Sequence, residues 1–255
     1  MKKLFKMSAV TLFVLIVFSA CGRNESVSGQ ITSFPPYGER VVTAIGDSIA
    51  AGYGLDSQED NYLTLFSDNI GAVLNNDAVS GYDSGEVLKS LSDEKTAADI
   101  KNADAIVVSV GGNDFFHRKD IMIDALKNAL LHGEGFFPEE VTNIYDEYEK
   151  NLSRIIDEIK NMNPDAYIIV QTVYNPFLKQ TLNFSYINVG KTANRYVTRL
   201  NDSIKNVCKT KNRVFVFDVA PEMNEDAENF YGTDEKLDIH PTKHGHATLA
   251  RVFTE

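Results

Sequence analysis

The sequence has little of what several classes of protein require. Its 255 residues include only two cysteines, Cys21 and Cys208, so neither a disulfide framework nor a cysteine-based metal site can be built. Acidic residues outnumber basic ones by 36 to 25, the formal net charge is −11, and no basic stripe is present to neutralise phosphates. No repeat with a period of about 20–50 residues is visible. These features disfavour a disulfide-stapled scaffold, a repeat array and a protein that binds nucleic acid.

Three familiar motifs are also missing. The segment Gly52-Tyr53-Gly54 offers two glycines of a dinucleotide-binding fingerprint, but Ser57 stands where the third glycine belongs. There is no Gly-Lys-Ser/Thr phosphate loop and no Gly-x-Ser-x-Gly nucleophile elbow. The sequence therefore indicates neither a nucleotide-binding protein nor the common α/β-hydrolase arrangement.

The first 40 residues differ from the rest of the chain. Lys2, Lys3 and Lys6 precede an apolar run of about a dozen residues, and the small residues Ser19 and Ala20 precede Cys21. This pattern is typical of a secretory signal, and its end resembles a bacterial lipobox. We predict a lipoprotein signal peptide over residues 1–21, with lipidation at Cys21, and a flexible tether over 22–40. A plain signal peptide and an uncleaved anchor are the alternatives.

Apolar strand-like runs alternate with amphipathic helix-like segments from residue 41 to residue 255. This alternation predicts an α/β domain with a parallel sheet covered on both faces. The composition, 43% hydrophobic and 24% charged, suits one large core. The predicted strands are Val41 to Ile45, one ending at Ala78 and Val79, Ala105 to Val110, Ala166 to Val173 and Val214 to Val219; the predicted helices are Tyr62 to Leu74, Ser84 to Leu91, Asp120 to Leu131, Ile144 to Met162, Tyr186 to Cys208 and His244 to Phe253.

Polar motifs follow three of the predicted strands, and a fourth lies near the end of the chain. They are Gly46-Asp47-Ser48, Ser80-Gly81, Gly111-Gly112-Asn113-Asp114 and Asp238-Ile239-His240-Pro241. Ligands of parallel sheets bind outside the carboxyl ends of the strands, so the topology collects the first three motifs at one edge.

The first and last motifs supply a nucleophile and a base. Ser48 needs a base within hydrogen-bond reach, and we predict that His240 takes its proton while Asp238 orients the imidazole. Taken alone, Asp47 or Ser48 is equally well explained as a helix N-cap, and His240 as a residue of a surface loop. A metal site of His240, His244 and His246 is disfavoured, because a helix starting near Lys243 places the last two on different faces.

The two middle motifs supply donors for a developing oxyanion. We predict that these are the backbone N–H groups of Ser48 and Gly81 and the side-chain amide of Asn113. The simpler explanations are a turn glycine and an Asx-turn.

Together, the four blocks resemble those of the SGNH (GDSL) hydrolases, over residues 41–255. The resemblance implies a flavodoxin-like three-layer α/β/α sandwich with a five-stranded parallel sheet, and ester hydrolysis through an acyl-enzyme without metal or other cofactor. It matches Ser48 to the nucleophile, Gly81 and Asn113 to the oxyanion donors and His240 to the base. The family's acid commonly lies three residues before the histidine, where this chain has Leu237. Asp238, Asp234 or no carboxylate then remain possible partners of His240.

Aromatic residues near these blocks are candidates for substrate binding. Tyr174-Asn175-Pro176-Phe177 resembles a motif of lipase-like bacterial members, and Phe115 and Phe116 follow the third block. We predict that Phe115, Tyr174 and Asn175 contact substrate, and that Phe136 and Phe137 line an acyl pocket or belong to a lid within residues 115–150. An ordinary place in the core is the alternative for most of them.

Three functions are compatible with these features. The first is an outward-facing, membrane-anchored esterase of the lipase or lysophospholipase type. The second is an O-acetylesterase acting on polysaccharide or cell-envelope glycans. The third is a non-catalytic surface-binding lipoprotein. The expected partners are an ester substrate and, through the lipid anchor, the membrane, but not nucleic acid.

Overall fold

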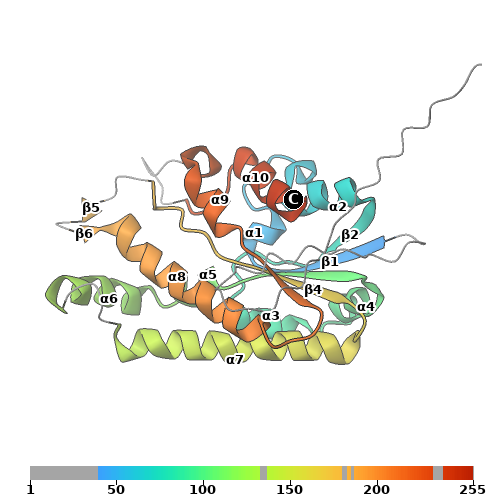
Figure 1. Ribbon diagram of the computed structural model, residues 1–255, viewed down its shortest axis with the longest axis horizontal. Helices are drawn as coiled ribbons and strands as arrows, with labels where there is room; N and C mark the ends of the chain where they lie inside the picture. Colours follow the sequence, from blue (N-terminus) through green and yellow to red (C-terminus); the bar gives the residue numbers. More distant parts are fainter. Residues whose placement is uncertain (1–39, 133–136, 180–182, 185–186, 232–237, 255) are drawn as a thin grey trace, which may run out of the picture.

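A five-stranded parallel sheet forms the centre of the protein (Figure 1). The computed structural model describes residues 40–132, 137–179, 183–184, 187–231 and 238–254. The strands lie in the order β2-β1-β3-β4-β7, and every neighbouring pair is parallel. Their bounds are Ala72–Asn76 for β2, Arg40–Gly46 for β1, Ala105–Ser109 for β3, Tyr167–Gln171 for β4 and Val214–Phe217 for β7. This order confirms the predicted flavodoxin-like sheet and puts its switch point between the ends of β1 and β3.

The central strands are apolar because both of their faces are covered. All five residues of β3 are buried, as are the last five of β1. The two edge strands, β2 and β7, are only partly buried. A near-continuous apolar run in the middle of the sheet is typical of a parallel sheet between two layers of helices.

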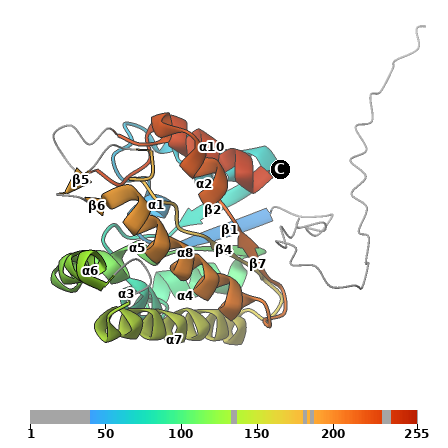
Figure 2. The same ribbon diagram turned by 60° about the vertical axis from the view of Figure 1, so that its left-hand side comes forward.

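The helices form one layer on each face of the sheet (Figures 1 and 2). The even-numbered β1 residues Val42 and Ala44 face the core under α2 (Tyr62–Ile70), α9 (Ala220–Glu225) and α10 (Lys243–Thr254). Ile45, which follows Ala44 in the strand, faces the opposite side of the sheet and belongs to the other core. That core is covered by α3 (Ser84–Ser90), α4 (Glu94–Asn102), α7 (Glu139–Met162) and α8 (Val189–Cys208). The arrangement confirms the predicted three-layer α/β/α sandwich.

The second strand lies earlier in the chain than predicted. The helix predicted from Tyr62 to Leu74 ends at Ile70, where Gly71 adopts a left-handed conformation as its C-cap. Val73 and Leu74 therefore belong to β2, and Ala78 and Val79 lie beyond the strand that they were predicted to end. The prediction failed because a partly exposed edge strand continued the apolar spacing of the preceding helix.

Several other elements complete the described chain. They are α1 (Ser48–Ala51), α5 (Gly112–Phe116), α6 (Lys119–His132), the 3₁₀ turns Gln58–Asp60 and Ala227–Asn229, and a two-stranded hairpin of β5 (Asn183–Phe184) and β6 (Ile187–Asn188). The helices α4, α5 and α9 and the hairpin were not predicted. Among the described residues, no helix combines the length and hydropathy needed to cross a bilayer. The predicted signal peptide and all but the last residue of the predicted tether lie outside the described residues.

Candidate active site

The turn after β1 places Ser48 at the switch point of the sheet. Gly46 pairs in register with Ser109 of β3, and the backbone N–H of Asp47 donates to the Ser109 carbonyl at 3.0 Å. Gly46 has a φ of +150°, and a Cβ at this position would lie 2.1 Å from the Ser109 carbonyl oxygen. Only glycine fits this close crossing of two backbones, and it allows the helix α1 to begin at once with Ser48.

Asp47 holds the start of this helix. Its carboxylate accepts a hydrogen bond from the backbone N–H of Ile49 at 3.0 Å, as the N-cap of α1. The side chain is buried, and burial raises the pKa of Asp47 to about 7. The cap thus fixes the N-terminus of α1, and the Ser48 side chain lies at the carboxyl end of β1.

The serine and histidine motifs meet although 192 residues separate them. The His240 Nε2 atom lies 2.9 Å from the Ser48 Oγ atom. On the other side of the ring, His240 Nδ1 lies 2.7 Å from Asp238 Oδ1, and this carboxylate oxygen also accepts the His240 backbone N–H at 3.0 Å. The carboxylate that contacts the imidazole is therefore Asp238, within the same loop. Leu237 and Asp234 lie outside the described residues.

The loop that carries His240 is held by contacts with three other parts of the chain. Pro241 forms a β-bridge with Phe230. The hydroxyl of Tyr174 donates to the Ile239 carbonyl at 3.3 Å, and the ring of Tyr53 lies against the imidazole with centroids 4.5 Å apart. These contacts fix the backbone on both sides of His240 and cover one face of its ring.

Asn113 lies in the first turn of α5. One N–H of its carboxamide donates to the backbone carbonyl of Tyr82 at 2.9 Å. A carboxamide nitrogen carries two hydrogens, so the second remains available for a substrate oxygen. Asn113 and Ser48 line the same pocket.

Gly81 immediately precedes Tyr82 and is exposed in a left-handed turn with a φ of +92°. Within the part of the chain that the structure describes, no hydrogen bond uses the backbone N–H of Gly81 or that of Ser48. Among the described residues, the N–H groups of Gly81 and Ser48, which are predicted to donate to an oxyanion, therefore have no acceptor in the protein. Their role in binding an oxyanion stays a prediction.

A pocket beside Ser48 opens at the carboxyl ends of β1, β3 and β4, and Gly81 and His240 are not among the residues that line it. Its walls are mainly apolar. The lining residues are Asp47, Ser48, Ile49, Ser109, Val110, Gly112, Asn113, Phe116, Gln171, Val173, Tyr174, Pro176 and Ile239. Of the three residues predicted to contact substrate, Tyr174 lines this pocket.

The other two residues predicted to contact substrate, Phe115 and Asn175, do not line this pocket. The ring of Phe115 packs against Tyr145 in the core, with centroids 5.0 Å apart, and its neighbour Phe116 lines the pocket. The buried carboxamide of Asn175 donates to the Gly190 carbonyl at 2.8 Å and accepts the Phe177 N–H, so it shapes the loop. Adjacent residues of a turn point in different directions, and the sequence alone did not reveal which of them faces the pocket.

The two phenylalanines predicted to line an acyl pocket or belong to a lid, Phe136 and Phe137, precede α7 in the sequence. Phe137 packs against Tyr196, beneath the guanidinium of Arg199, and thus belongs to the core surface and not to the pocket. Phe136 lies outside the described residues.

Comparison with known proteins places this geometry in a family. The model of the GDSL-like lipase/acylhydrolase family matches residues 44–248, which span β1 to α10. The chain belongs to this family. This confirms the predicted SGNH (GDSL) relationship and the prediction of a carboxylic ester hydrolase.

Individual relatives of this GDSL-like hydrolase are distant. The uncharacterized protein YpmR of Bacillus subtilis is 28% identical over 218 residues, which cover 83% of this chain and 78% of YpmR. The spore germination lipase LipC of Bacillus licheniformis is 23% identical over 215 residues, covering 82% and 92% of the two chains. Among solved structures, the lipase Lip_vut3 from a goat rumen metagenome has a TM-score of 0.67 at 19% identity and covers 84% of this chain and 96% of its own. The last likeness shows the shared fold.

The two histidines of α10 in this GDSL-like hydrolase, His244 and His246, have partners other than His240. His246 is buried, and its Nδ1 accepts the backbone N–H of Tyr62 at 3.3 Å. His244 is exposed and its Nε2 lies 3.1 Å from Asp226. The structure therefore separates the two histidines of α10 in the way that their spacing predicted.

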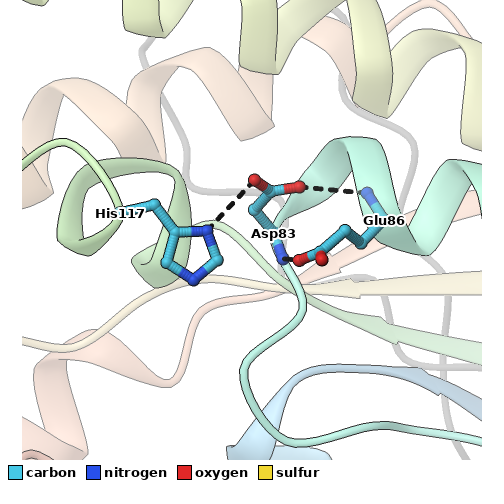
Figure 3. Close-up of side chains that lie close together, drawn as sticks. All are labelled: Asp83, Glu86 and His117. Atoms are coloured by element: carbon cyan, nitrogen blue, oxygen red, sulfur yellow. Dashed lines mark hydrogen bonds and ion pairs between the residues drawn. The ribbon is translucent and has the colours of Figure 1, made fainter.

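Two clusters of possible metal ligands occur among the described residues, and Figure 3 shows the one at the start of α3. It consists of Asp83, Glu86 and His117. The two carboxylates form a capping box at the start of α3, each accepting the other residue's backbone N–H at 3.0 Å. His117 Nδ1 lies 3.2 Å from Asp83. Helix capping accounts for the two carboxylates without a metal.

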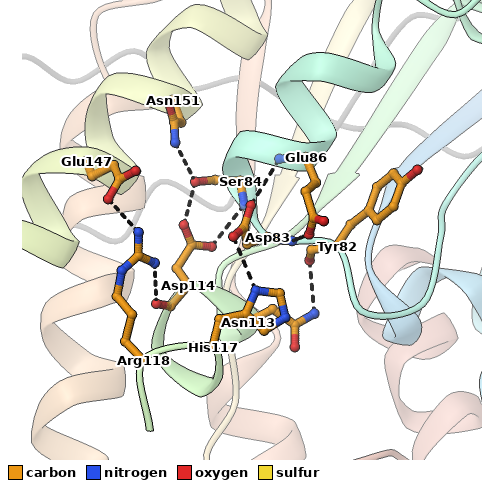
Figure 4. Close-up of polar contacts among 10 residues, drawn as sticks. All are labelled: Tyr82, Asp83, Ser84, Glu86, Asn113, Asp114, His117, Arg118, Glu147 and Asn151. Atoms are coloured by element: carbon orange, nitrogen blue, oxygen red, sulfur yellow. Dashed lines mark hydrogen bonds and ion pairs between the residues drawn. The ribbon is translucent and has the colours of Figure 1, made fainter. Parts of the chain in front are cut away.

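Two residues of the site were missed in the sequence. Tyr53 was considered only as part of a glycine-rich turn, yet its ring covers His240. Asp114 was quoted as the last residue of the third motif but was given no role. It is buried behind Asn113 in a network of polar contacts (Figure 4). The signal for Asp114 was its position next to Asn113 in an otherwise apolar segment.

Proposed function

We propose that this GDSL-like hydrolase cleaves lipid esters through an acyl-enzyme on Ser48. The observation that carries the proposal is the chain of contacts from Asp238 to His240 to Ser48, with distances of 2.7 and 2.9 Å. A serine hydroxyl becomes an effective nucleophile when a neutral imidazole accepts its proton, and a carboxylate on the far nitrogen favours the tautomer that can do so.

In the first half of the reaction, Ser48 Oγ attacks the ester carbonyl while His240 Nε2 takes its proton. The carbonyl oxygen becomes an oxyanion that accepts hydrogen bonds from the Ser48 N–H, the Gly81 N–H and the Asn113 amide. When the tetrahedral intermediate collapses, the C–O bond to the alcohol breaks and His240 returns the proton to that alcohol. In the second half, water repeats these steps against the acyl-enzyme, which releases the acid and restores Ser48.

The apolar wall of the pocket supports a lipid acyl group. Val110, Phe116, Val173 and Pro176 all line it within the space that begins at Ser48. Apolar walls around a few polar groups suit the acyl chain and the carbonyl of an ester, respectively. The description of LipC as a lipase is consistent with this choice.

Labelling with an organophosphonate tests the catalytic assignment. The wild-type protein should lose activity as one phosphonyl group attaches to Ser48, identified by mass spectrometry of the peptide. Ser48→Ala should abolish both labelling and hydrolysis. Ser67→Ala is the matched control, because Ser67 is another buried helical serine that does not line the pocket. Unchanged hydrolysis by Ser48→Ala would refute the proposal and favour a non-catalytic binding role.

A series of p-nitrophenyl esters from acetate to palmitate tests the substrate class. A lipid esterase should give its highest kcat/KM with acyl chains longer than acetate. Strict preference for acetate would contradict the lipid assignment and support an O-acetylesterase of glycans.

We further propose that the mature protein is a lipoprotein anchored through Cys21 on the outer side of the membrane, with residues 22–40 as its tether. The basic start, the short apolar run and the small residues before Cys21 support this location. Full-length protein expressed in a bacterium should partition into the detergent phase of a Triton X-114 extract, whereas Cys21→Ser should move to the aqueous phase. Equal partitioning of the two would refute lipidation at Cys21.

A further inference from the structure

Asp114 is a buried carboxylate directly behind the side chain proposed to bind the oxyanion. The residue is only 3% exposed, and it follows Asn113 in the first turn of α5. Its Oδ2 atom accepts the backbone N–H of Ser84 at 3.1 Å, and its Oδ1 atom accepts the Ser84 hydroxyl. Asp114 does not line the pocket that contains Ser48 and Asn113. The carboxylate therefore faces away from the space available to substrate.

Ser84 connects Asp114 to two longer helices, α3 and α7 (Figure 4). It is the first residue of α3, and its hydroxyl accepts a hydrogen bond from the carboxamide of Asn151 in α7 at 3.0 Å. The hydroxyl thus donates to Asp114 and accepts from Asn151, which uses its hydrogen and one of its lone pairs. Through Ser84, the five-residue helix α5 is tied to α3 and α7 at a single buried point.

Further contacts join the same two segments on either side of Asp114. The Asn113 carboxamide donates to the Tyr82 carbonyl, and His117 lies against Asp83. The guanidinium of Arg118 donates to the Asp114 backbone carbonyl at 2.8 Å and to Glu147 of α7 at 2.6 Å. The helix α5 and the segment from Tyr82 to Ser84 are consequently held against each other, and Gly81 directly precedes this segment.

We propose that Asp114 is a positioning residue, which fixes the Asn113 carboxamide relative to the Gly81 N–H through its paired hydrogen bonds to Ser84. This inference rests on the proposed function, in which these two groups donate to the same oxyanion. They come from different loops, separated by about thirty residues, so their spacing depends on the contacts between the loops and not on local backbone geometry.

The chemistry of the contact suits this role. Burial raises the pKa of Asp114 to about 6, whereas the hydrogen bonds that both of its oxygens accept from Ser84 lower the pKa and favour the ionised carboxylate. Hydrogen bonds to an ionised acceptor are stronger and more strongly oriented than those between neutral groups. Asp83 raises the pKa of this carboxyl further and Arg118 lowers it, and both side chains belong to the same network.

A double-mutant cycle tests whether Asp114 acts through Asn113. Ser84→Ala removes one hydrogen bond to Asp114, and Asp114→Asn keeps the size of the side chain while removing its charge. Each should lower kcat about tenfold and change KM less than twofold, since a displaced donor weakens transition-state binding more than substrate binding. In an Asn113→Ala background, each should lower kcat by less than twofold, because the donor that they position is already absent.

Ser90→Ala is the matched control. Ser90 is the last residue of the same helix, it is buried, and its hydroxyl donates to the Val87 carbonyl at 2.8 Å without touching Asp114. Its replacement should leave kcat within about twofold of the wild type. Thermal unfolding of every variant shows whether it remains folded at the assay temperature; if Asp114→Asn unfolds, the cycle is completed with Ser84→Ala.

The outcomes separate this inference from the proposed function. Unchanged kcat in Ser84→Ala and Asp114→Asn would overturn the positioning role, and so would the same tenfold loss with and without the Asn113 carboxamide. Either result leaves the function of Ser48 intact if Ser48→Ala is inactive. An active Ser48→Ala variant would instead refute the proposed function.

Discussion

The two carboxylates behind the site, Asp238 and Asp114, are held in opposite ways. The side chain of Asp238 is 36% exposed, and it contacts His240, two residues along the same loop. Asp114 is 3% exposed as a residue, and it contacts Ser84, thirty residues away on another helix. One carboxylate orients the proposed base, whereas the other anchors the proposed oxyanion donor.

This difference shows how the two halves of one site acquire their geometry. The Asp238–His240 pair is a local unit of one turn, and the remainder of the fold has only to bring it to Ser48. Asn113, by contrast, depends on the packing of α5 against α3 and α7 (Figure 4). We therefore expect changes on the His240 side to alter proton transfer with little effect on stability, and changes on the Asn113 side to affect both.

The largest effect is expected for His240. His240→Ala should lower kcat/KM by about 10⁴-fold or more, because Ser48 loses the acceptor of its proton. The wild-type rate should also fall at acid pH, where a protonated imidazole cannot accept. His244→Ala is the matched control, an exposed histidine paired with Asp226, and should retain activity. A pH-independent rate, or similar activities for the two variants, would contradict the role of His240.

A large effect on kcat is also expected for Asn113. Asn113→Ala should lower kcat by about 10²- to 10³-fold with a small change in KM, since an oxyanion donor acts mainly in the transition state. Asn102→Ala serves as control, because its exposed carboxamide only donates to the Ala98 carbonyl of its own helix. A loss confined to KM would show that Asn113 binds the ground state of the substrate instead.

The effect of Asp238 should be similar in size to that of Asn113 or larger. Asp238→Asn should lower kcat/KM by about 10²- to 10⁴-fold, because the loop still presents the imidazole but its tautomer is no longer favoured. Asp226→Asn is the control: it removes the carboxylate that contacts the exposed His244, and kcat/KM should remain unchanged. Full activity of Asp238→Asn would indicate a Ser–His dyad and break the comparison between the two carboxylates.

The last and smallest effect concerns stability. Burial raises the pKa of Asp47 from 3.8 to about 7, so the folded protein holds this proton more tightly than the unfolded chain does. The contribution of this bound proton to the free energy of unfolding is complete below about pH 4 and is lost as the pH rises through 7. Asp47→Asn keeps the cap on Ile49 but cannot ionise, so its Tm relative to the wild type should increase by a few degrees between pH 4.5 and pH 8.

The exposed N-cap residue Asp93 provides the control for this measurement, since Asp93→Asn should show no such change with pH. A Tm difference between Asp47→Asn and the wild type that stays constant over this range would contradict a buried, proton-binding Asp47.

Much of the fold was predictable because its signals are local. Buried strands such as β3 are continuous apolar runs, and long helices such as α7 show their apolar face at helical spacing. The boundary between α2 and β2 was mistaken because an apolar edge strand directly follows a helix capped by Gly71. Pocket-facing residues were predicted less well: Phe115 and Phe116 are equivalent in sequence, but only Phe116 lines the pocket.

The sequence by itself determined the order of the strands and helices, the glycine that lets β1 cross β3, and the polar blocks at the strand ends, because each depends on contacts or conformations within a few residues. Only the tertiary structure decided that Asp238 contacts the imidazole, that Tyr53 covers its ring and that Asp114 joins Asn113 to Ser84. The contacts of Tyr53 and Asp114 join segments far apart in the chain, and the Asp238 contact lies in a loop that Phe230 and Tyr174 hold in place from elsewhere in the chain.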